Sequence, residues 1–370
     1  MISAESINQR WELLQSITRP SGYTTIAVRW HICLLSNVME TIDFVITWVD
    51  GNDPIWRKER DHYAALEHRE IDNDDSKYRD WGTLRFLFRG IEKFAPWVHK
   101  VFFVTCGHLP EWLDTGNPKL EVVRHEDFIP AEYLPTFNSN VIELYFHKIE
   151  GLSERFVYFN DDMLLLDDIT PDRFFRHGLP CEKAAMTSLE NRDGMFGCSV
   201  FLANYLVNKH IDKRTAVRNH FLKWHNPLLP KTAIHNLFYY RHHRFPGFYT
   251  HHLAQSYLKQ TYRQVWNHCE KDLERTSRSK FRSYGDIAPW LLKFWQLASG
   301  DFTPYDVDKI GKCLYLEDES IPRSVDFIMH KQKKLICLND SENIRHFEKD
   351  KELLLKALNT ILPERCGFEL

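Results

Sequence analysis

The chain has 370 residues, of which 43% are hydrophobic and 27% are charged, proportions that are ordinary for a soluble globular protein. This length allows a large core, in one elaborated domain or two closely joined ones. The formal net charge of -3 argues against a nucleic-acid-binding protein, because no overall basic excess is present to displace counterions from phosphates. The eight cysteines lie far apart without a Cys-x-x-Cys pair, which predicts reduced thiols and argues against a zinc site.

The first 40 residues are predicted to be an extension outside the main fold. Residues 1–20 lack the basic-then-apolar order of a secretion signal. The apolar window 26–39 is interrupted by Arg29 and is too short to span a bilayer. We therefore expect a cytoplasmic protein with at most peripheral contact with the inner face of the cell membrane. Four apolar residues at helical spacing predict a helix that packs against the main domain: Ile7, Trp11, Leu14 and Ile17.

Three short runs of β-branched and aromatic residues end abruptly in polar residues or glycine, at 43–51, 101–107 and 156–162. This pattern is typical of buried strands that deliver their last residues to the edge of a sheet. Because ligands of open α/β sheets bind at the carboxyl ends of the strands, Asp50, Gly107 and the sequence Asn160-Asp161-Asp162 are expected to converge on one crevice. Two adjacent carboxylates there suggest a metal-assisted reaction on a phosphate-bearing substrate.

The segments around these runs predict the remaining elements. Apolar residues at i, i+3, i+4 and i+7 predict a helix that begins near residue 84 and is ended by Pro96. With the flanking strands it forms a β-loop-α-β unit, for which parallel pairing is expected. A weaker strand is predicted at 120–123. Asn140 and Glu143 have capping-box spacing for a helix over 141–149. Near the end, residues 334–340 predict a strand, followed by an amphipathic helix.

Several groups could carry chemistry, and each has a simpler structural interpretation. Asp161 and Asp162 could hold Mg²⁺ or Mn²⁺ against phosphates, or could only form a turn that caps the next segment. The histidines at 242, 243, 251 and 252 could supply a general acid or base, or could be polar surface. The basic stretches 276–282 and 231–244 could contact a phosphate and a membrane surface respectively, or could be solvated.

In their order along the chain, these motifs resemble the signature regions of the Stealth proteins. This family includes bacterial capsular polysaccharide phosphotransferases and the catalytic part of the animal N-acetylglucosamine-1-phosphotransferase. The matching residues form four regions: 43–53; 78–85 with 91–97, 134–139 and 151–162; 248–282; and 335–340. The second region is long and ordered enough that coincidence is implausible.

The resemblance implies a fold and a reaction. The fold would be α/β and GT-A-like, with a mostly parallel central sheet and a helical insertion. The reaction would transfer a hexose or N-acetylhexosamine 1-phosphate from a UDP-sugar to a hydroxyl of a growing polysaccharide, which can be lipid-linked, and would release UMP. Two alternatives stay open: a GT-A glycosyltransferase that releases UDP, and a non-catalytic component of polysaccharide assembly.

We expect the chain to be divided into four parts. Residues 1–40 would be the extension and residues 41–170 the nucleotide-sugar-binding core. Residues 171–333 would form a helical acceptor-side region that completes the active site. Residues 334–370 would add a strand and a helix packed on the core.

The resemblance also implies catalytic roles for Asp162, His252 and Arg282. Asp161 and Asp162 would hold the Mg²⁺ or Mn²⁺ ion, Arg282 would stabilise charge on the transferring group, and His252 would accept the acceptor proton or protonate the departing phosphate. His251 competes with His252, because the residues that follow differ here from the Pro-containing motif of many relatives.

Substrate-binding roles are expected for a further set of residues. The end of the first strand would receive uridine through Trp48, Val49, Asp50 and Gly51. Arg85 and Arg89 would contact phosphate or serve the structure, with Glu92 or Glu143 as alternative partners of Arg89. Asn138 and Asn160 complete the predicted set.

Overall fold

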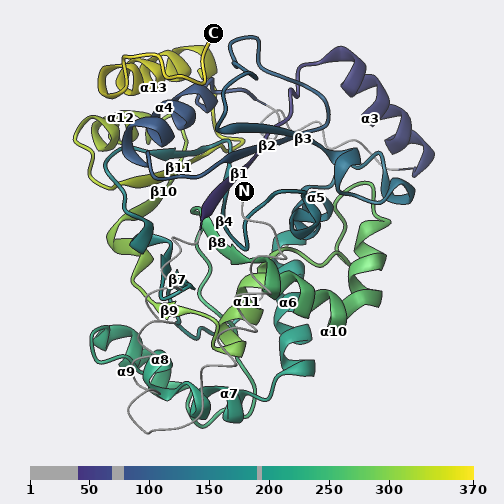
Figure 1. Ribbon diagram of the computed structural model, residues 1–370, viewed down its shortest axis with the longest axis vertical. Helices are drawn as coiled ribbons and strands as arrows, with labels where there is room; N and C mark the ends of the chain where they lie inside the picture. The colour runs from purple at the N-terminus through teal and green to yellow at the C-terminus, as the bar shows by residue number, and fades with distance from the viewer. Residues whose placement is uncertain (1–40, 69–78, 190–193) are drawn as a thin grey trace, which may run out of the picture. The chain divides into compact units, whose positions relative to one another are not determined.

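A five-stranded sheet runs through the middle of the structure in the order β3-β2-β1-β4-β8 (Figure 1). Its strands are β1 (Ile42–Thr47), β2 (Val101–Thr105), β3 (Leu120–Arg124), β4 (Arg155–Asn160) and β8 (Gln255–Leu258). The first four are mutually parallel, and β8 pairs antiparallel with β4 at the edge. This arrangement confirms the predicted α/β class, the mostly parallel sheet and the positions of the predicted strands.

This structure is a computed structural model, which describes residues 41–68, 79–189 and 194–370. The predicted N-terminal extension, with its helix, lies outside the described residues. Residues 41–370 form one unit. The functional boundaries expected at residues 170 and 333 stay predictions.

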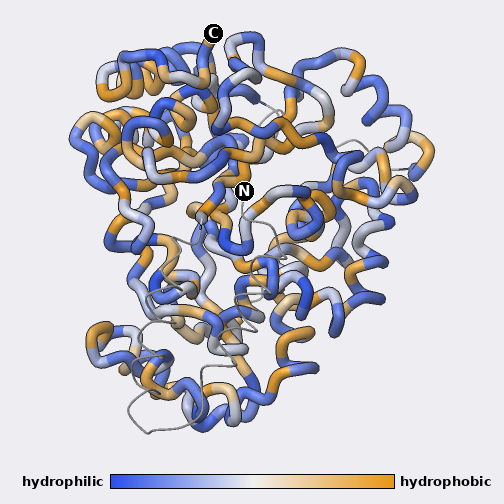
Figure 2. The backbone as a smooth tube through the Cα atoms, in the orientation of Figure 1, coloured by the Kyte–Doolittle hydropathy of each residue, from blue (hydrophilic) through white to orange (hydrophobic). Residues whose placement is uncertain are grey.

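The central strands separate two hydrophobic cores, because successive side chains of a strand point to opposite faces. Phe44 of β1 and Phe159 of β4 face the first core, where their ring centroids are 4.7 Å apart. Val45 and Tyr158 face the second core. The alternation explains why the strands read as continuous apolar runs, which Figure 2 shows as hydrophobic segments in the middle of the molecule.

Two smaller sheets flank the central one. The first consists of β10 (Gly311–Tyr315), β11 (Leu335–Asn339) and β5 (Met163–Leu165), in which β11 runs antiparallel to β5. The second consists of β6 (Phe175–Arg176), β7 (Leu179–Glu182) and β9 (Thr303–Pro304). The strand predicted at 334–340 is therefore confirmed as β11.

Helices cover both faces of the central sheet (Figure 1). Those on the side of the first core are α4 (Leu84–Phe94), α12 (Ile321–Met329) and α13 (Phe347–Ile361). Those on the side of the second core include α5 (Ser139–Leu144), α6 (Met195–His210), α10 (Lys259–Ser277) and α11 (Trp290–Ser299). The others are α3 (Pro54–Leu66), α7 (Lys213–Asn219), α8 (Phe221–Trp224) and α9 (Pro230–Phe238).

The helix expected at 141–149 begins earlier and ends sooner than predicted. The Asn138 side chain, and not that of Asn140, caps it by accepting a 3.1 Å hydrogen bond from the backbone N–H of Asn140. The helix α5 then ends at Leu144 and is followed by a short 3-10 turn over Phe146–Lys148. The prediction was wrong because two asparagines two positions apart offer similar capping signals.

The predicted helix at 84–94 and the final amphipathic helix are confirmed. Within the described ranges no helix combines the length and apolar character needed to cross a bilayer.

Candidate active site

The register of the central sheet brings the polar strand ends to one edge. Thr47, the last residue of β1, lies opposite Val104 of β2 and Asn160 of β4. The chain therefore leaves β1 between the ends of its two neighbours. The residues after the three strands thus lie along the carboxyl edge of the sheet, and their convergence on one crevice stays a prediction.

One side of this edge is formed by the ends of β1 and β2. The backbone N–H of Asp50 donates to Nδ1 of His108 at 3.2 Å, and Trp48 stacks on Phe103 with ring centroids 5.9 Å apart. Gly107 has a φ of 119°, and a side chain there would meet no atom within 4 Å. A ligand could thus approach the backbone at Gly107 closely. Val49 and Gly51 lie in the same turn, and the Gly51 carbonyl accepts from the Arg57 guanidinium.

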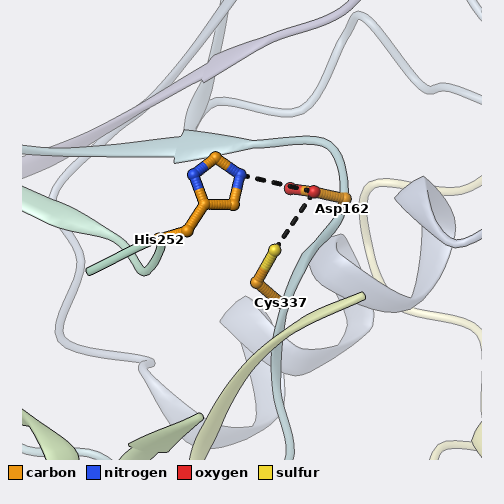
Figure 3. A group of neighbouring side chains, drawn as sticks. All are labelled: Asp162, His252 and Cys337. Atoms are coloured by element: carbon orange, nitrogen blue, oxygen red, sulfur yellow. Dashed lines mark hydrogen bonds and ion pairs between the residues drawn. The ribbon is translucent and has the colours of Figure 1, made fainter. Parts of the chain in front are cut away.

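The other side of the edge is completed by the segment before β8. Because β8 runs antiparallel to β4, with Gln255 opposite Tyr158, the residues before β8 lie beside the end of β4. His252 is thereby placed with its Nε2 atom 3.7 Å from Oδ2 of Asp162 (Figure 3). The same Nε2 atom lies 3.5 Å from Nδ2 of Asn160. Burial opposes protonation of His252, but the hydrogen bond and the charge of Asp162 outweigh it and raise the pKa of the imidazole.

A third side chain joins this pair from the small sheet. Since Cys337 of β11 lies opposite Met163 of β5, its thiol is next to Asp162 and donates to Oδ2 at 3.1 Å (Figure 3). The donor atoms of Asp162, His252 and Cys337 all lie within 4.8 Å of one another. The sequence analysis did not select Cys337, although it belongs to the fourth matching region.

The second oxygen of Asp162 has no partner. Its Oδ1 atom is buried and accepts no hydrogen bond in the described part of the chain. A buried carboxylate oxygen without a partner is costly, so it indicates a position where a cation or a ligand donor completes the site.

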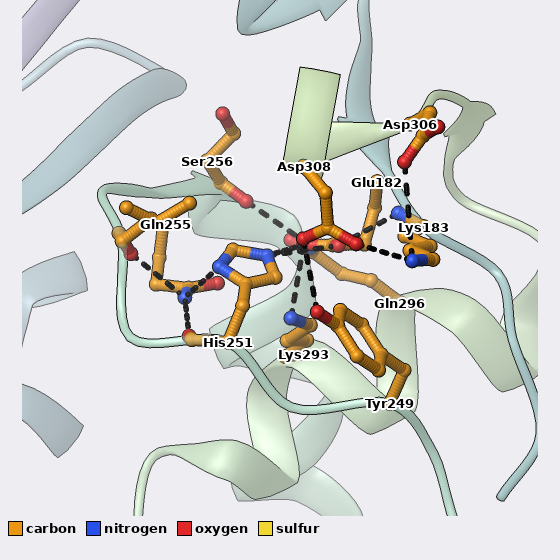
Figure 4. A network of polar contacts seen from close by, with 11 residues as sticks. Glu182, Lys183, Tyr249, His251, Gln255, Ser256, Lys293, Gln296, Asp306 and Asp308 are labelled. Atoms are coloured by element: carbon orange, nitrogen blue, oxygen red, sulfur yellow. Dashed lines mark hydrogen bonds and ion pairs between the residues drawn. The ribbon is translucent and has the colours of Figure 1, made fainter. Parts of the chain in front are cut away.

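The two neighbouring histidines differ sharply in their surroundings. The side chain of His251 is 5% exposed, and its Nε2 atom donates to the Glu182 carboxylate at 3.1 Å, whereas the side chain of His252 is 38% exposed. Glu182 also pairs with the buried Lys293 at 3.3 Å (Figure 4). Burial and the charge of Lys293 lower the pKa of His251 to about 4, so this imidazole is neutral near pH 7. His251 therefore belongs to a buried polar network, and His252 is the histidine beside Asp162.

Glu143 links Arg282 to this centre. It lies on α5, where burial raises its pKa to about 7 while the charge of Arg282, a hydrogen bond from Tyr158 and the charge of His252 act in the opposite direction. The Arg282 guanidinium also donates to the Ser139 hydroxyl at the start of α5. Glu143 was expected to cap a helix or to pair with Arg89 and was not among the predicted site residues, because a single glutamate in a helix gives no sign of what it faces.

A pocket of about 590 Å³ opens beside the carboxylates. It is lined by the ends of β4 and β11 and by the segment before α4, including Asp161, Asp162, Arg79 and Asp340. The Arg79 guanidinium holds the Asp340 carboxylate through two 3.0 Å hydrogen bonds. Two effects raise the pKa of Asp161 to about 7. The larger is its burial away from water, and the smaller is the negative charge of Asp162. Asp161 is therefore partly protonated near pH 7, and a cation bound beside it would favour the charged carboxylate.

Three predicted substrate-binding residues have their polar atoms or charge engaged elsewhere. Arg89 is buried and forms a bidentate pair with Glu369 at 2.6 and 2.9 Å, in place of the suggested partners Glu92 and Glu143. Arg85 lies over the ring of Trp112. The buried Asn138 caps α5 and donates to the Asp286 carboxylate at 2.8 Å.

Comparisons with known proteins identify the family. Residues 40–65 match the model of Stealth protein CR1, conserved region 1, and residues 77–181 match that of Stealth protein CR2, conserved region 2. The chain is 37% identical to the capsular polysaccharide phosphotransferase WcwK of Streptococcus pneumoniae over 333 residues, which cover 90% of this chain and 100% of that protein. The chain belongs to the Stealth family. The resemblance inferred from the motifs, and with it the transferase class, is confirmed.

Further Stealth relatives agree. The receptor polysaccharide phosphotransferase WefC of Streptococcus gordonii is 37% identical, over 90% of this chain and all of that protein. The exopolysaccharide phosphotransferase cps2G of Lactiplantibacillus plantarum is 33% identical, over 89% of this chain and 96% of that protein. Among solved structures, the galactosyltransferase LgtC with donor and acceptor sugar analogues covers 85% of this chain and 95% of its own, with 11% identity and a TM-score of 0.36.

Proposed function

We propose that this Stealth protein transfers a hexose or N-acetylhexosamine 1-phosphate from a UDP-sugar to a hydroxyl of a growing capsular or cell-surface polysaccharide. The products would be a phosphodiester and UMP. The observation that carries the proposal is the contact of His252 with Asp162, whose other oxygen is buried and unpartnered. The names of the relatives support the phosphotransferase reaction and a polysaccharide acceptor.

The residues fit a divalent cation. Mg²⁺ and Mn²⁺ prefer carboxylate oxygens and usually take one or two of them, leaving the other positions to water and substrate phosphates. Asp161 and Asp162 would hold the ion, with the free Oδ1 of Asp162 as one donor. The ion would neutralise charge on the diphosphate of the donor.

The reaction itself requires one new bond and one broken bond. The acceptor hydroxyl oxygen bonds to the phosphorus attached to the sugar, and the bond from this phosphorus to the bridging oxygen breaks, so that UMP leaves with that oxygen. His252 takes the acceptor proton or supplies a proton to the departing phosphate, and its raised pKa makes it a stronger base than an ordinary histidine. In-line positioning would account for much of the rate.

The negative charge on the transferring phosphate group would also be stabilised by a positively charged side chain. Arg282 would supply it, and Glu143 would orient Arg282 and His252 through its interactions with both. Uridine would bind at the strand end formed by Trp48, Val49, Asp50 and Gly51, with Asn160 near the reacting phosphate. Arg85, Arg89 and Asn138, which are engaged elsewhere, would support the site through the structure.

The location of the reaction is part of the proposal. A cytoplasmic enzyme would use UDP-sugars, and a lipid-linked acceptor would require contact with the inner face of the cell membrane.

Identification of the nucleotide product tests the proposed function. The purified protein would be incubated with UDP-N-acetylglucosamine and other UDP-sugars, with and without Mg²⁺ or Mn²⁺, and the nucleotides separated by chromatography. Metal-dependent release of UMP is expected. Release of UDP would mean attack on the anomeric carbon and would overturn the proposal in favour of a glycosyltransferase. Absence of both products with every donor, in the presence of acceptor polysaccharide, would favour a non-catalytic assembly component.

A further inference from the structure

The segment 213–244 differs in charge from the rest of the chain. The sequence from residue 213 to residue 269 contains no Asp or Glu, although the whole chain has a net charge of -3. Seven basic residues fall within 213–244: Lys213, Arg214, Arg218, Lys223, Lys231, Arg241 and Arg244. The segment is therefore strongly basic, although the net charge of the whole chain is slightly negative. We call it the basic lobe.

The structure gathers this charge at one end of the molecule. The helices of the basic lobe, α7, α8 and α9, lie together at the lower end of the view in Figure 1. Five of the seven basic residues are exposed: Arg214, Arg218, Lys231, Arg241 and Arg244. Arg214 contacts the His243 ring and Arg244 donates to the Asn208 carbonyl, and the charges of both help to lower the pKa of Asp212. The acidic groups that flank the lobe are Asp212, which caps α7, and Asp301 near Lys223.

The helix α9 presents its apolar side to the outside. Ile234, Leu237 and Phe238 lie at i, i+3 and i+4, and their exposed fractions are 59%, 54% and 75%. The polar Asn236 of the same helix is fully buried. A helix packed on a protein core normally shows the opposite arrangement, so this apolar stripe is suited to an apolar environment outside the protein.

The buried side of the basic lobe is anchored by Asn236 and Trp224, although the buried Nε1 of Trp224 and Nε2 of His225 have no hydrogen-bond partner among the described residues. The Asn236 amide donates to the carbonyls of Ala184 and Trp224 at 2.7 and 2.6 Å, and its oxygen accepts from the Met186 N–H at 2.8 Å. Trp224 is fully buried against Phe245. The lobe is thus held rigidly with its apolar stripe outward.

Three further apolar residues of the basic lobe are exposed. Phe221 and Leu222 of α8 and Leu228 of the connection to α9 are 44%, 72% and 83% exposed. In the described part of the lobe this apolar face stands beside five exposed Lys and Arg, with Asp212 and Asp301 as flanking acidic groups. An apolar face with an excess of basic residues is the pattern of elements that lie in the interface of an anionic bilayer. A second copy of this chain is a poor occupant, because two basic lobes would repel each other.

We propose that the basic lobe docks on a membrane that contains anionic phospholipids, with Leu237 and Phe238 inserted among the lipids and the basic side chains at the headgroups. The proposal deepens the proposed function, because it names the surface that would bring the enzyme to a lipid-linked acceptor. Lipid binding does not require the transfer reaction, so the two can fail separately.

Sedimentation of the full chain with vesicles tests the proposal. Vesicles of equal parts phosphatidylglycerol and phosphatidylcholine should bind the protein, pure phosphatidylcholine vesicles should bind it much more weakly, and added salt should weaken the anionic binding. The double variant Leu237→Ser, Phe238→Ser should reduce binding at least tenfold. The variant Lys231→Gln, Arg241→Gln should reduce it about fivefold for each charge removed, since one basic residue near an anionic surface contributes about 1 kcal/mol.

Matched variants on α3 provide the control. Ile55 and Leu66 are 78% and 61% exposed, and Lys58 is also exposed. Ile55→Ser with Leu66→Ser, and Lys58→Gln, should leave vesicle binding unchanged. UMP release without vesicles and thermal unfolding should be unaltered in all variants. Equal binding of the lobe variants and the wild type, equal binding to neutral and anionic vesicles, or a dimer in solution that the lobe variants dissociate would each overturn the proposal.

Discussion

The Nε2 atom of His252 lies 3.7 Å from the Oδ2 atom of Asp162, although the two residues are far apart in the sequence. The antiparallel pairing of β8 with β4 creates this relationship, because it places the start of one strand beside the end of the other. A histidine and a carboxylate at this distance, partly open to solvent beside a pocket, can exchange protons with a bound substrate.

Removal of either partner should stop the reaction without unfolding the protein. We expect Asp162→Asn and His252→Ala each to lower kcat for UMP release by about 10²- to 10⁴-fold, the range usual for general acid–base groups. The exposed pair Asp326 and His330, whose atoms are 3.0 Å apart, offers matched controls. Asp326→Asn and His330→Ala should retain full turnover. Full activity in either site variant, with unchanged thermal unfolding, would refute the assignment.

Replacement of Glu143 should have an effect that depends on pH. Its pKa is about 7, so the carboxylate is charged above that pH and neutral below it. Glu143→Gln should therefore lower kcat strongly well above pH 7, where the anion orients Arg282 and His252, and much less below it. Profiles of kcat against pH for wild type, Glu143→Gln and the exposed control Glu150→Gln would check this. An equal loss at all pH values would point to a role in packing alone.

Removal of divalent cations should abolish UMP release. After treatment with a chelator, Mg²⁺ or Mn²⁺ should restore turnover, and Asp161→Asn should raise the concentration of metal that is needed, because one of two carboxylate donors is lost. Metal titrations of turnover would measure this. Thermal unfolding with and without the ion gives a second readout, since a cation bound to the folded state alone stabilises it. Undiminished turnover in the chelator would contradict the predicted metal site.

Protein stability should fall as the pH drops from about 6.5 towards 4. The pKa of His251 is lowered from 6.5 to about 4 by burial and by Lys293, so the unfolded chain binds a proton in this window that the folded chain does not. Burial also lowers the pKa of His125 to about 4 and, with nearby basic residues, that of His147 to about 3, so these histidines act in the same direction.

The variant His251→Gln tests how much His251 contributes to the loss of stability on acidification. A glutamine can still donate to Glu182 but does not titrate, so the loss of stability on acidification should become smaller without disappearing. Denaturant unfolding at several pH values would measure it. An unchanged slope would mean that His251 does not contribute.

Disruption of the Arg89–Glu369 pair should affect stability more than turnover. The side chains are 7% and 3% exposed, and removal of one partner leaves a buried charge. We expect Glu369→Gln to lower the free energy of unfolding by about 3 kcal/mol. The exposed Glu364→Gln should have almost no effect. A large rise in KM for the UDP-sugar with unchanged stability would instead support the predicted role of Arg89 in substrate binding.

The sequence by itself determined the strands and the edge at which the site lies. Runs such as 101–105 are short and rich in β-branched and aromatic residues, which favours buried strands, and their abrupt polar ends predict where ligands meet the sheet. The family motifs led to Asp162, His252 and Arg282. These features are local, or are carried by the order of motifs along the chain.

Only the tertiary structure decided which distant residues meet. Cys337 reaches Asp162 because β11 pairs with β5, and His251 turns away from the pocket because a buried carboxylate and Lys293 hold it. The outward apolar stripe of α9 likewise depends on which side of the helix is packed, since periodicity gives the angle between side chains and not the direction of the core. Pairing between strands and burial of charges depend on contacts between distant parts of the chain, so they cannot be predicted from the pattern of a single sequence.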